Sequence, residues 1–124
     1  MAKILVIDKS EQLLEVLSLL FRVNGHEVVT ATGITDTVKC IKEFSPNLIL
    51  LDALFGHNSG KELCKEIKTF HPTIPVLLMS ADPEMLNHCK ECKADDIIEK
   101  PFDIVILNNK INKLLVVKHV QAPG

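Results

Sequence analysis

Five short apolar runs, each followed by a segment with helical spacing, constrain the fold of this 124-residue chain more than any other feature. The runs lie near 3–7, 27–31, 47–51, 76–79 and 96–99 and consist mainly of Ile, Leu and Val. Several are apolar at consecutive positions, which is typical of parallel strands that are covered on both faces. The intervening segments repeat apolar residues at helical intervals, the first at Leu13, Leu14, Leu17, Leu20 and Phe21. The pattern predicts a doubly wound α/β fold of five β-α units with helices on both faces of a parallel sheet.

Capping signals agree with this division. Ser59 and Glu62 have the spacing of a capping box at the start of the third helix. Asp103 can cap the last helix, which we predict over about 103–118. Asn24 and Gly25 form a typical end for the first helix, since glycine tolerates the left-handed conformation there. We predict one domain over residues 1–120, with 121–124 as a tail or the start of a linker.

Composition excludes several classes of function. The net charge of −2 comes without a cluster of Lys and Arg, so direct binding to nucleic acid is not expected. The longest apolar runs are much shorter than the roughly 20 residues that cross a bilayer, and no export signal follows Met1. We therefore expect no membrane association and a cytoplasmic location. A domain of this size does not need disulfides, so we expect reduced thiols at Cys40, Cys64, Cys89 and Cys92.

Four of the predicted strands end in residues that can carry chemistry. The first ends in Asp8 and Lys9, the third in Asp52, the fourth in Ser80 and the fifth in Lys100. Open α/β sheets bind ligands beyond the carboxyl ends of their strands, so these side chains are expected to share one site. Two neighbouring carboxylates repel each other and favour a bound cation, and Mg²⁺ prefers oxygen ligands.

The motifs that carry these residues are "ILVID", "PNLILLD", "PVLLMSA" and "ADDIIEKPF", in this order along the chain. The ordered set resembles response-regulator receiver domains of two-component phosphorelay systems, and the resemblance covers residues 2–118. It implies a flavodoxin-like (βα)5 fold with a five-stranded parallel sheet in the order 2-1-3-4-5. It also implies a signalling domain that catalyses only its own phosphorylation and dephosphorylation.

The resemblance implies a role for each residue of the site. Asp52 would accept a phosphoryl group from a sensor histidine kinase or a histidine phosphotransfer protein. Asp8, Asp52 and the backbone carbonyl of Leu54 would hold Mg²⁺. Lys100 and the Ser80 hydroxyl would bind the phosphoryl oxygens, and Ser80 would couple the new phosphate to a movement of the loop after the fourth strand.

Lys9 and Ile97 depart from the family pattern. Lys9 stands where the family has a second metal-binding acid, and with Asp8, Asp52 and Lys100 it gives the four residues a net charge of zero. If the Lys9 ammonium points inward, Mg²⁺ affinity should fall by orders of magnitude, whereas an outward side chain would leave a weaker two-carboxylate site. Ile97 replaces a common aromatic switch residue, so switching through a rotating ring is in doubt.

Two alternative functions follow from these features. Lys9 in place of a metal-binding acid would favour a pseudo-receiver, which is a phosphorylation-independent interaction module. A flavodoxin-like FMN-binding protein would share the fold, although its phosphate loop after the first strand should be rich in Ser, Thr and Gly instead of carrying Asp8. No other cofactor site is predicted.

Two further segments are interpreted from their composition. The motif "HCKEC" at residues 88–92 contains a CxxC, but zinc needs about four ligands and no second pair exists at finger spacing, so we interpret the thiols as packing residues of the fourth helix. The fourth and fifth helices also offer apolar candidates for a homodimer or for binding an output partner or effector domain, namely Met85, Leu86, Val105 and Ile106.

Overall fold

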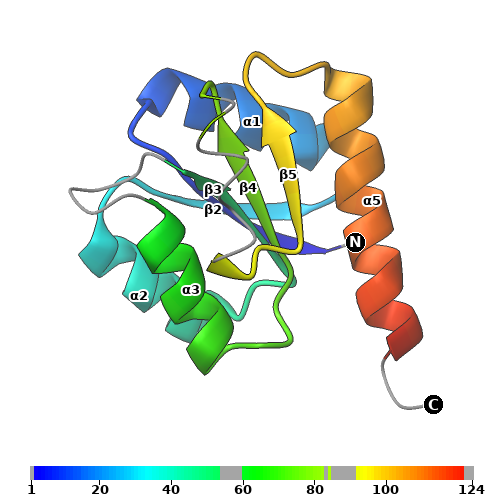
Figure 1. Cartoon of the computed structure of the whole chain (residues 1–124). Coiled ribbons are helices and arrows are strands. Elements are labelled where there is room, and N and C mark those ends of the chain that lie inside the picture. The colour runs from blue at the N-terminus through cyan, green and yellow to red at the C-terminus, as the bar shows by residue number, and fades with distance from the viewer. Residues whose placement is uncertain (1, 54–59, 83, 85–91, 122–124) are drawn as a thin grey trace.

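The computed structural model describes residues 2–53, 60–82, 84 and 92–121, with side chains up to residue 116. Nine helices and strands are assigned within these residues (Figure 1): β1 Lys3–Ile7, α1 Glu11–Val23, β2 Glu27–Ala31, α2 Ile34–Phe44, β3 Leu48–Asp52, α3 Gly60–Phe70, β4 Val76–Ser80, β5 Asp96–Glu99 and α5 Ile104–Gln121. All strand pairs are parallel, and the sheet order is β2-β1-β3-β4-β5. The predicted doubly wound order 2-1-3-4-5 is confirmed.

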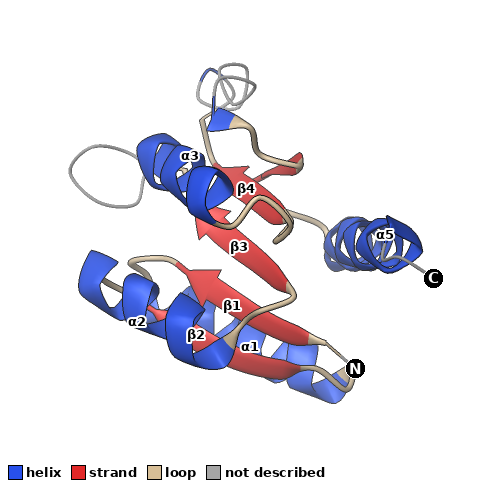
Figure 2. Ribbon diagram, turned by 90° about the horizontal axis from the view of Figure 1, so that it is seen from below, coloured by secondary structure: helices blue, strands red, loops and turns tan. Residues whose placement is uncertain are grey.

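Two apolar layers enclose the sheet, one on each face. Figure 2 shows α2 and α3 on one face and α1 and α5 on the other. The α2–α3 layer packs Ile41, Leu63 and Ile67 against the sheet. The opposite layer packs Phe21 of α1 and Leu107 of α5 against it. Every residue of β3 is buried, as is every residue of β4, which explains why these strands are apolar at consecutive positions.

The helix ends follow the predicted signals where the structure describes them. Gly25 has a φ of +89° and its N–H donates to the carbonyl of Arg22, while the N–H of His26 donates to the carbonyl of Phe21. This pair of bonds is a Schellman motif. The Asp103 carboxylate accepts hydrogen bonds from the N–H groups of Val105 and Ile106, at 2.7 and 3.4 Å, and so caps α5.

Some predictions fall on residues that the structure does not describe. These are most of the fourth helix, the capping residue Ser59 and the candidate contact residues Met85 and Leu86. The two candidates on α5 are exposed, as predicted: Val105 by 65% and Ile106 by 50%. Within the described part of the chain, no helix combines the length and hydropathy needed to cross a bilayer.

Candidate functional site

The carboxyl ends of four parallel strands bring the predicted residues together. Asp52 and Ser80 are the last residues of β3 and β4, whereas Asp8 and Lys100 directly follow β1 and β5. The registers Ile7↔Leu51, Asp52↔Met79 and Ser80↔Glu99 align these ends at one edge of the sheet. The predicted convergence of the two acids, the hydroxyl and the amine is therefore present in the fold.

An ion pair holds the centre of this site. Lys100 Nζ lies 2.7 Å from Asp8 Oδ2 and 3.8 Å from Asp52 Oδ2. The other oxygen of Asp8 accepts a hydrogen bond of 2.8 Å from the N–H of Ser10. The exposed fractions of the side chains are 3% for Asp8, 13% for Asp52 and 22% for Lys100. Solvent therefore reaches Asp52 more readily than Asp8.

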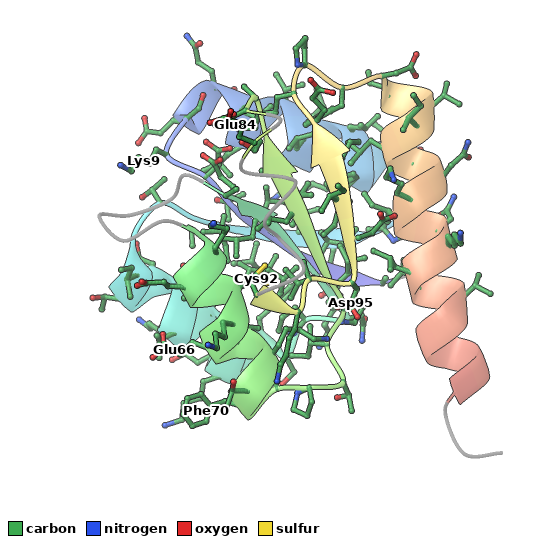
Figure 3. The ribbon with its side chains drawn as sticks, in the orientation of Figure 1. Lys9, Glu66, Phe70, Glu84, Cys92 and Asp95 are labelled. Atoms are coloured by element: carbon green, nitrogen blue, oxygen red, sulfur yellow. The ribbon has the colours of Figure 1, made fainter. Side chains whose placement is uncertain are left out.

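Lys9 lies outside this ion pair. Its side chain is exposed, and Figure 3 shows it at the margin of the molecule, directed away from the sheet. The outward alternative is thus the one observed, and the long stem keeps the ammonium in water. Two carboxylates and one ammonium then leave the site with a net charge of −1 instead of zero.

Ser80 is buried beside the ion pair. Its Oγ accepts a hydrogen bond of 3.0 Å from the N–H of Asp82, and its carbonyl accepts one of 2.8 Å from the N–H of Lys100. Ser80 therefore contacts both the loop that follows β4 and the lysine that follows β5. Ile97 of β5 is half-buried and packs against the α2–α3 layer. The switch roles assigned to Ser80 and Ile97 stay predictions.

Gly60 at the start of α3 packs directly against the backbone of Asp52, a contact that was not predicted from the sequence. Its N–H donates to the carbonyl of Ala53 at 2.7 Å. A Cβ at this position would overlap the carbonyl oxygen of Asp52 and would lie 2.9 Å from its carbonyl carbon. The first turn of α3 can approach the end of β3 this closely because residue 60 has no side chain.

The donor set of the site fits Mg²⁺. This ion is commonly held by one or two carboxylates, with water and phosphate oxygens completing its octahedral shell. Asp8 and Asp52 supply two carboxylates with a residual negative charge. Among the described residues no group of three or more His, Cys, Asp and Glu side chains is arranged for a metal, and Leu54, the predicted carbonyl ligand, lies outside them.

The Cys92 thiol of the "HCKEC" motif lies against α3. Cys92 is 2% exposed, Cys64 is fully buried, and Cys64 Sγ donates to the carbonyl of Cys92 at 3.5 Å. A hydrogen bond with the Cys92 side chain, together with burial, raises the pKa of the Cys64 thiol. Among the described residues, neither of these cysteines nor Cys40 forms a disulfide. The packing interpretation fits Cys92, while residues 88–91 lie outside the described part.

Comparison with known proteins places this arrangement in a family. The sequence matches the response regulator receiver domain over residues 4–112, and the chain belongs to this family of two-component signalling domains. It is 29% identical over 124 residues to the alkaline phosphatase synthesis transcriptional regulatory protein PhoP of Bacillus subtilis, covering 98% of this chain and 52% of that protein. Response regulator RR06 of Streptococcus pneumoniae is 31% identical over 114 residues, 90% of this chain and 52% of that protein. The chain spans about half the length of these relatives.

Solved structures show the same fold. NtrX from Brucella abortus superimposes with a TM-score of 0.89 at 28% identity, over 97% of this chain and 28% of that one. The isolated receiver domain of NtrX gives a TM-score of 0.84 at 29% identity, over 91% and 98% of the two chains. A putative response regulator from Chloroflexus aurantiacus gives 0.85 at 25% identity, over 93% and 98%. The predicted family and fold are confirmed.

Proposed function

We propose that this receiver domain accepts a phosphoryl group on Asp52 from a histidine kinase or a histidine phosphotransfer protein. The observation that carries the proposal is the placement of Asp52 between Asp8, Ser80 and Lys100 at the carboxyl edge of the sheet. Asp52 is partly exposed to solvent, whereas Asp8 is almost completely buried. A phosphodonor can therefore approach Asp52, while Asp8 is placed to bind a cation.

The transfer step needs a nucleophile and compensation of charge. A carboxylate oxygen of Asp52 attacks the phosphorus of a phosphohistidine, the P–N bond breaks, and the imidazole leaves with the electron pair and takes up a proton. The product is an acyl phosphate on Asp52. Because protein groups in phosphoryl transfer chiefly position reactants and offset charge, the nearby ammonium of Lys100 has a direct use. Mg²⁺ held by Asp8 and Asp52 would supply further positive charge.

Lys100 can turn toward a phosphoryl group without a large movement. Its ammonium bonds Asp8 at 2.7 Å and is 3.8 Å from the Asp52 carboxylate. An ammonium has three donors, and among the described residues this one makes a hydrogen bond to Asp8. The remaining donors are thus available to oxygens attached to Asp52.

Ser80 is suited to report the modification. Its hydroxyl accepts a hydrogen bond from the N–H of Asp82 in the loop after β4, and the Asp82 carboxylate in turn accepts one of 3.0 Å from the N–H of Glu84. Movement of the hydroxyl toward a phosphoryl oxygen would pull on this chain of hydrogen bonds. Switches of this kind convert a local charge change into the displacement of a segment. An output partner or a second copy that contacts the exposed Val105 and Ile106 could read the result.

An apolar groove beside the site favours a protein as the phosphodonor. It has a volume of about 790 Å³ and runs between α1 and the start of α5, where its lining includes Leu13, Leu20, Phe102, Ile104 and Lys100. Since Lys100 belongs to both the groove and the site, a partner seated in the groove would present a residue to Asp52. We infer that the donor docks here.

The exposure of Lys9 supports phosphorylation over the interaction-only alternative. That alternative required the Lys9 ammonium inside the pocket, where it would repel Mg²⁺. Membership of the receiver family likewise favours phosphorylation over FMN binding.

Intact-mass spectrometry tests the proposal. Purified protein is incubated with acetyl phosphate and Mg²⁺, and we expect the mass of one phosphoryl group to be added to the wild type and not to Asp52→Asn. Asp95→Asn, which changes an acid at the other end of the sheet, should still be modified wherever it remains folded. Absence of modification in the wild type with acetyl phosphate and with every histidine kinase tried would contradict the proposal, as would equal modification of Asp52→Asn.

A further inference from the structure

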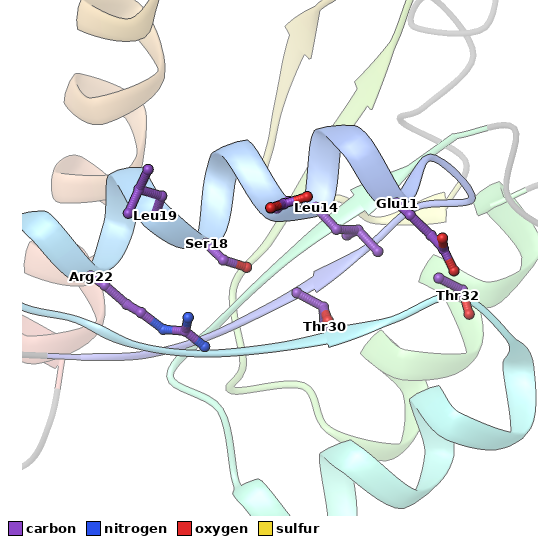
Figure 4. Close-up of a pocket in the computed structure, with 8 residues that line it drawn as sticks. Glu11, Leu14, Ser18, Leu19, Arg22, Thr30 and Thr32 are labelled. Carbon is purple, nitrogen blue, oxygen red and sulfur yellow. The ribbon is translucent and has the colours of Figure 1, made fainter.

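A second hollow lies on the edge of the sheet, between α1 and β2, and the phosphorylation site does not use it. Its volume is about 480 Å³ (Figure 4). Six polar side chains contribute to its lining: Glu11, Glu15, Ser18, Arg22, Thr30 and Thr32. Pockets of this size bind drug-sized ligands. The composition contrasts with the apolar groove on the other side of α1.

Ser18 is the deepest polar group of this hollow. The residue is 7% exposed, so more than nine-tenths of it is buried, and Figure 4 shows its hydroxyl pointing from α1 toward Thr30. No protein partner of this hydroxyl occurs among the described residues, and none of their buried side-chain polar atoms is left unpaired, so the hydroxyl is open to the hollow. It can therefore hydrogen-bond to a ligand or to water there.

Opposite charges stand at the two ends of the hollow. Arg22 lies at one end, where it makes a long hydrogen bond of 3.5 Å to the carbonyl of Val28. Glu11 lies at the other end beside Thr32 (Figure 4). Glu15 follows Glu11 by four residues on α1 and also lines the hollow. Eleven residues of helix separate Glu11 from Arg22, which corresponds to about 16 Å. A ligand with a positive charge at one end and a negative charge at the other would complement the glutamates and Arg22.

The floor of the hollow is an open strand edge. β2 is an outer strand, paired on one side with β1. The N–H of Glu27 and the carbonyl of Ala31 bond toward β1. Backbone groups alternate in direction along a strand, so those of Val28 and Thr30 face away from the sheet. Arg22 already bonds the outward carbonyl of Val28, and the outward N–H and carbonyl of Thr30 lie at the floor of the hollow.

We propose that this hollow binds an extended peptide segment of a partner protein, paired antiparallel with the edge of β2. The basic N-terminal end of the segment contacts Glu11 and Glu15, and its acidic C-terminal end contacts Arg22. Because β2 starts at the Arg22 end, this charge order fixes the antiparallel direction. Strand addition of this kind provides backbone hydrogen bonds, and about five extended residues span the distance. The lining of the hollow includes neither Asp52 nor Lys100.

Amide NMR of the ¹⁵N-labelled full chain tests the proposal with two peptides of equal composition. The probe is acetyl-Lys-Val-Thr-Val-Glu-amide, and its control has the reversed order, acetyl-Glu-Val-Thr-Val-Lys-amide. We expect shifts at Val28, Ser18 and Thr30 with the probe and a dissociation constant about fivefold lower than for the control, the size expected of two exposed charge pairs.

A charge swap within the protein makes the test sharper. The double variant Glu15→Arg with Arg22→Glu keeps the net charge and should reverse the preference between the two peptides. The matched swap Lys39→Glu with Glu43→Arg on α2 should leave the preference unchanged, and thermal unfolding confirms that both variants fold. The proposal is overturned by equal binding of both peptides, by no shift at Thr30 at millimolar peptide, or by a preference that the swap does not alter. Shifts of the same size with 6-aminohexanoate would overturn it in favour of a small dipolar molecule.

Discussion

Two lysine–aspartate pairs sit at opposite ends of the same sheet and differ in how completely the lysine is satisfied. At the amino ends of β4 and β5, Lys68 Nζ donates to Asp95 Oδ2 at 2.8 Å and to the carbonyls of Pro72 and Ile74 at 3.1 and 3.0 Å. Its three donors are all used, and its side chain is 10% exposed. Asp95 also accepts the N–H of Val76 at 2.7 Å. This pair joins α3 to the start of two strands.

The pair at the carboxyl ends is open by comparison. Lys100 makes a hydrogen bond to Asp8, lies 3.8 Å from Asp52 and is 22% exposed. Two carboxylates share this ammonium, so the site retains a negative charge and unused donors. The same two residue types thus form a closed pair, in which all three lysine donors are used, at one end of the sheet. At the other end they form an open pair, in which donors remain available. What separates them is the number of acceptors that the surrounding backbone supplies.

The largest expected effect tests the close packing of Gly60 against Asp52, next to the open pair. In Gly60→Ala the new methyl group would overlap the Asp52 carbonyl, so the first turn of α3 or the end of β3 must move. We expect the free energy of unfolding in urea to fall by about 3 kcal/mol, the upper range for overpacking. Gly33→Ala is the matched control: nothing lies within 4 Å of its Cβ position, and the change should stay within about 1 kcal/mol. Equal stabilities of the two variants would contradict the role of Gly60.

The second effect tests the closed pair of Lys68 and Asp95. Lys68→Met leaves the carboxylate of Asp95 and two carbonyls without their shared donor, and we expect a loss of about 2 kcal/mol in urea unfolding, since Asp95 remains partly exposed to solvent. Lys110→Met breaks a pair with Asp96 whose members are both 30% exposed, and it should cost about 0.5 kcal/mol. If the two variants lose the same stability, Lys68 is an ordinary surface charge.

A smaller effect is expected for Mg²⁺ affinity at the open end. Lys9→Asp replaces an exposed positive charge next to Asp8 by a negative one, and we expect calorimetric titration to show Mg²⁺ binding about tenfold tighter. Lys113→Asp makes the same charge change on α5 and should have little effect. Unchanged affinity in Lys9→Asp would show that Lys9 is too far from the carboxylates to influence the metal.

The smallest effect concerns the segment that leads into β5. Lys93 has a φ of +64°, a left-handed conformation that glycine adopts without strain. Lys93→Gly should raise the free energy of unfolding by about 1 kcal/mol, whereas Lys93→Ala should give no gain. Thermal or urea unfolding measures both, and a glycine variant that is no more stable than the alanine variant would contradict the prediction.

The strands and the four converging residues could be predicted because both depend on local signals, whereas the sheet order was predicted from the resemblance to receiver domains. The apolar runs mark the strands, and Asp8, Asp52, Ser80 and Lys100 each occupy a strand end. The direction of Lys9 could not be predicted, since a long flexible side chain reaches either the pocket or water from the same backbone position. The contact between Gly60 and the Asp52 carbonyl depends on how α3 packs against β3. A glycine at the start of a helix was its only signal in the sequence.

The left-handed Lys93 illustrates a second limit. The lysine itself gives no sign in the sequence that the backbone is left-handed at residue 93. Its φ of +64° arises where the backbone turns before entering β5. The cost of a side chain at this position therefore depends on backbone geometry.

Parallel measurements on Lys100→Met and Lys68→Met test the account most directly. For each variant, the rate of phosphorylation by acetyl phosphate is compared with the free energy of unfolding. We predict that the folded fraction of Lys100→Met loses most of its phosphorylation, and that Lys68→Met loses stability while its folded fraction is phosphorylated at the wild-type rate. If Lys100→Met is phosphorylated normally, or if both variants lose both properties to the same extent, the distinction between an open functional pair and a closed structural pair is wrong.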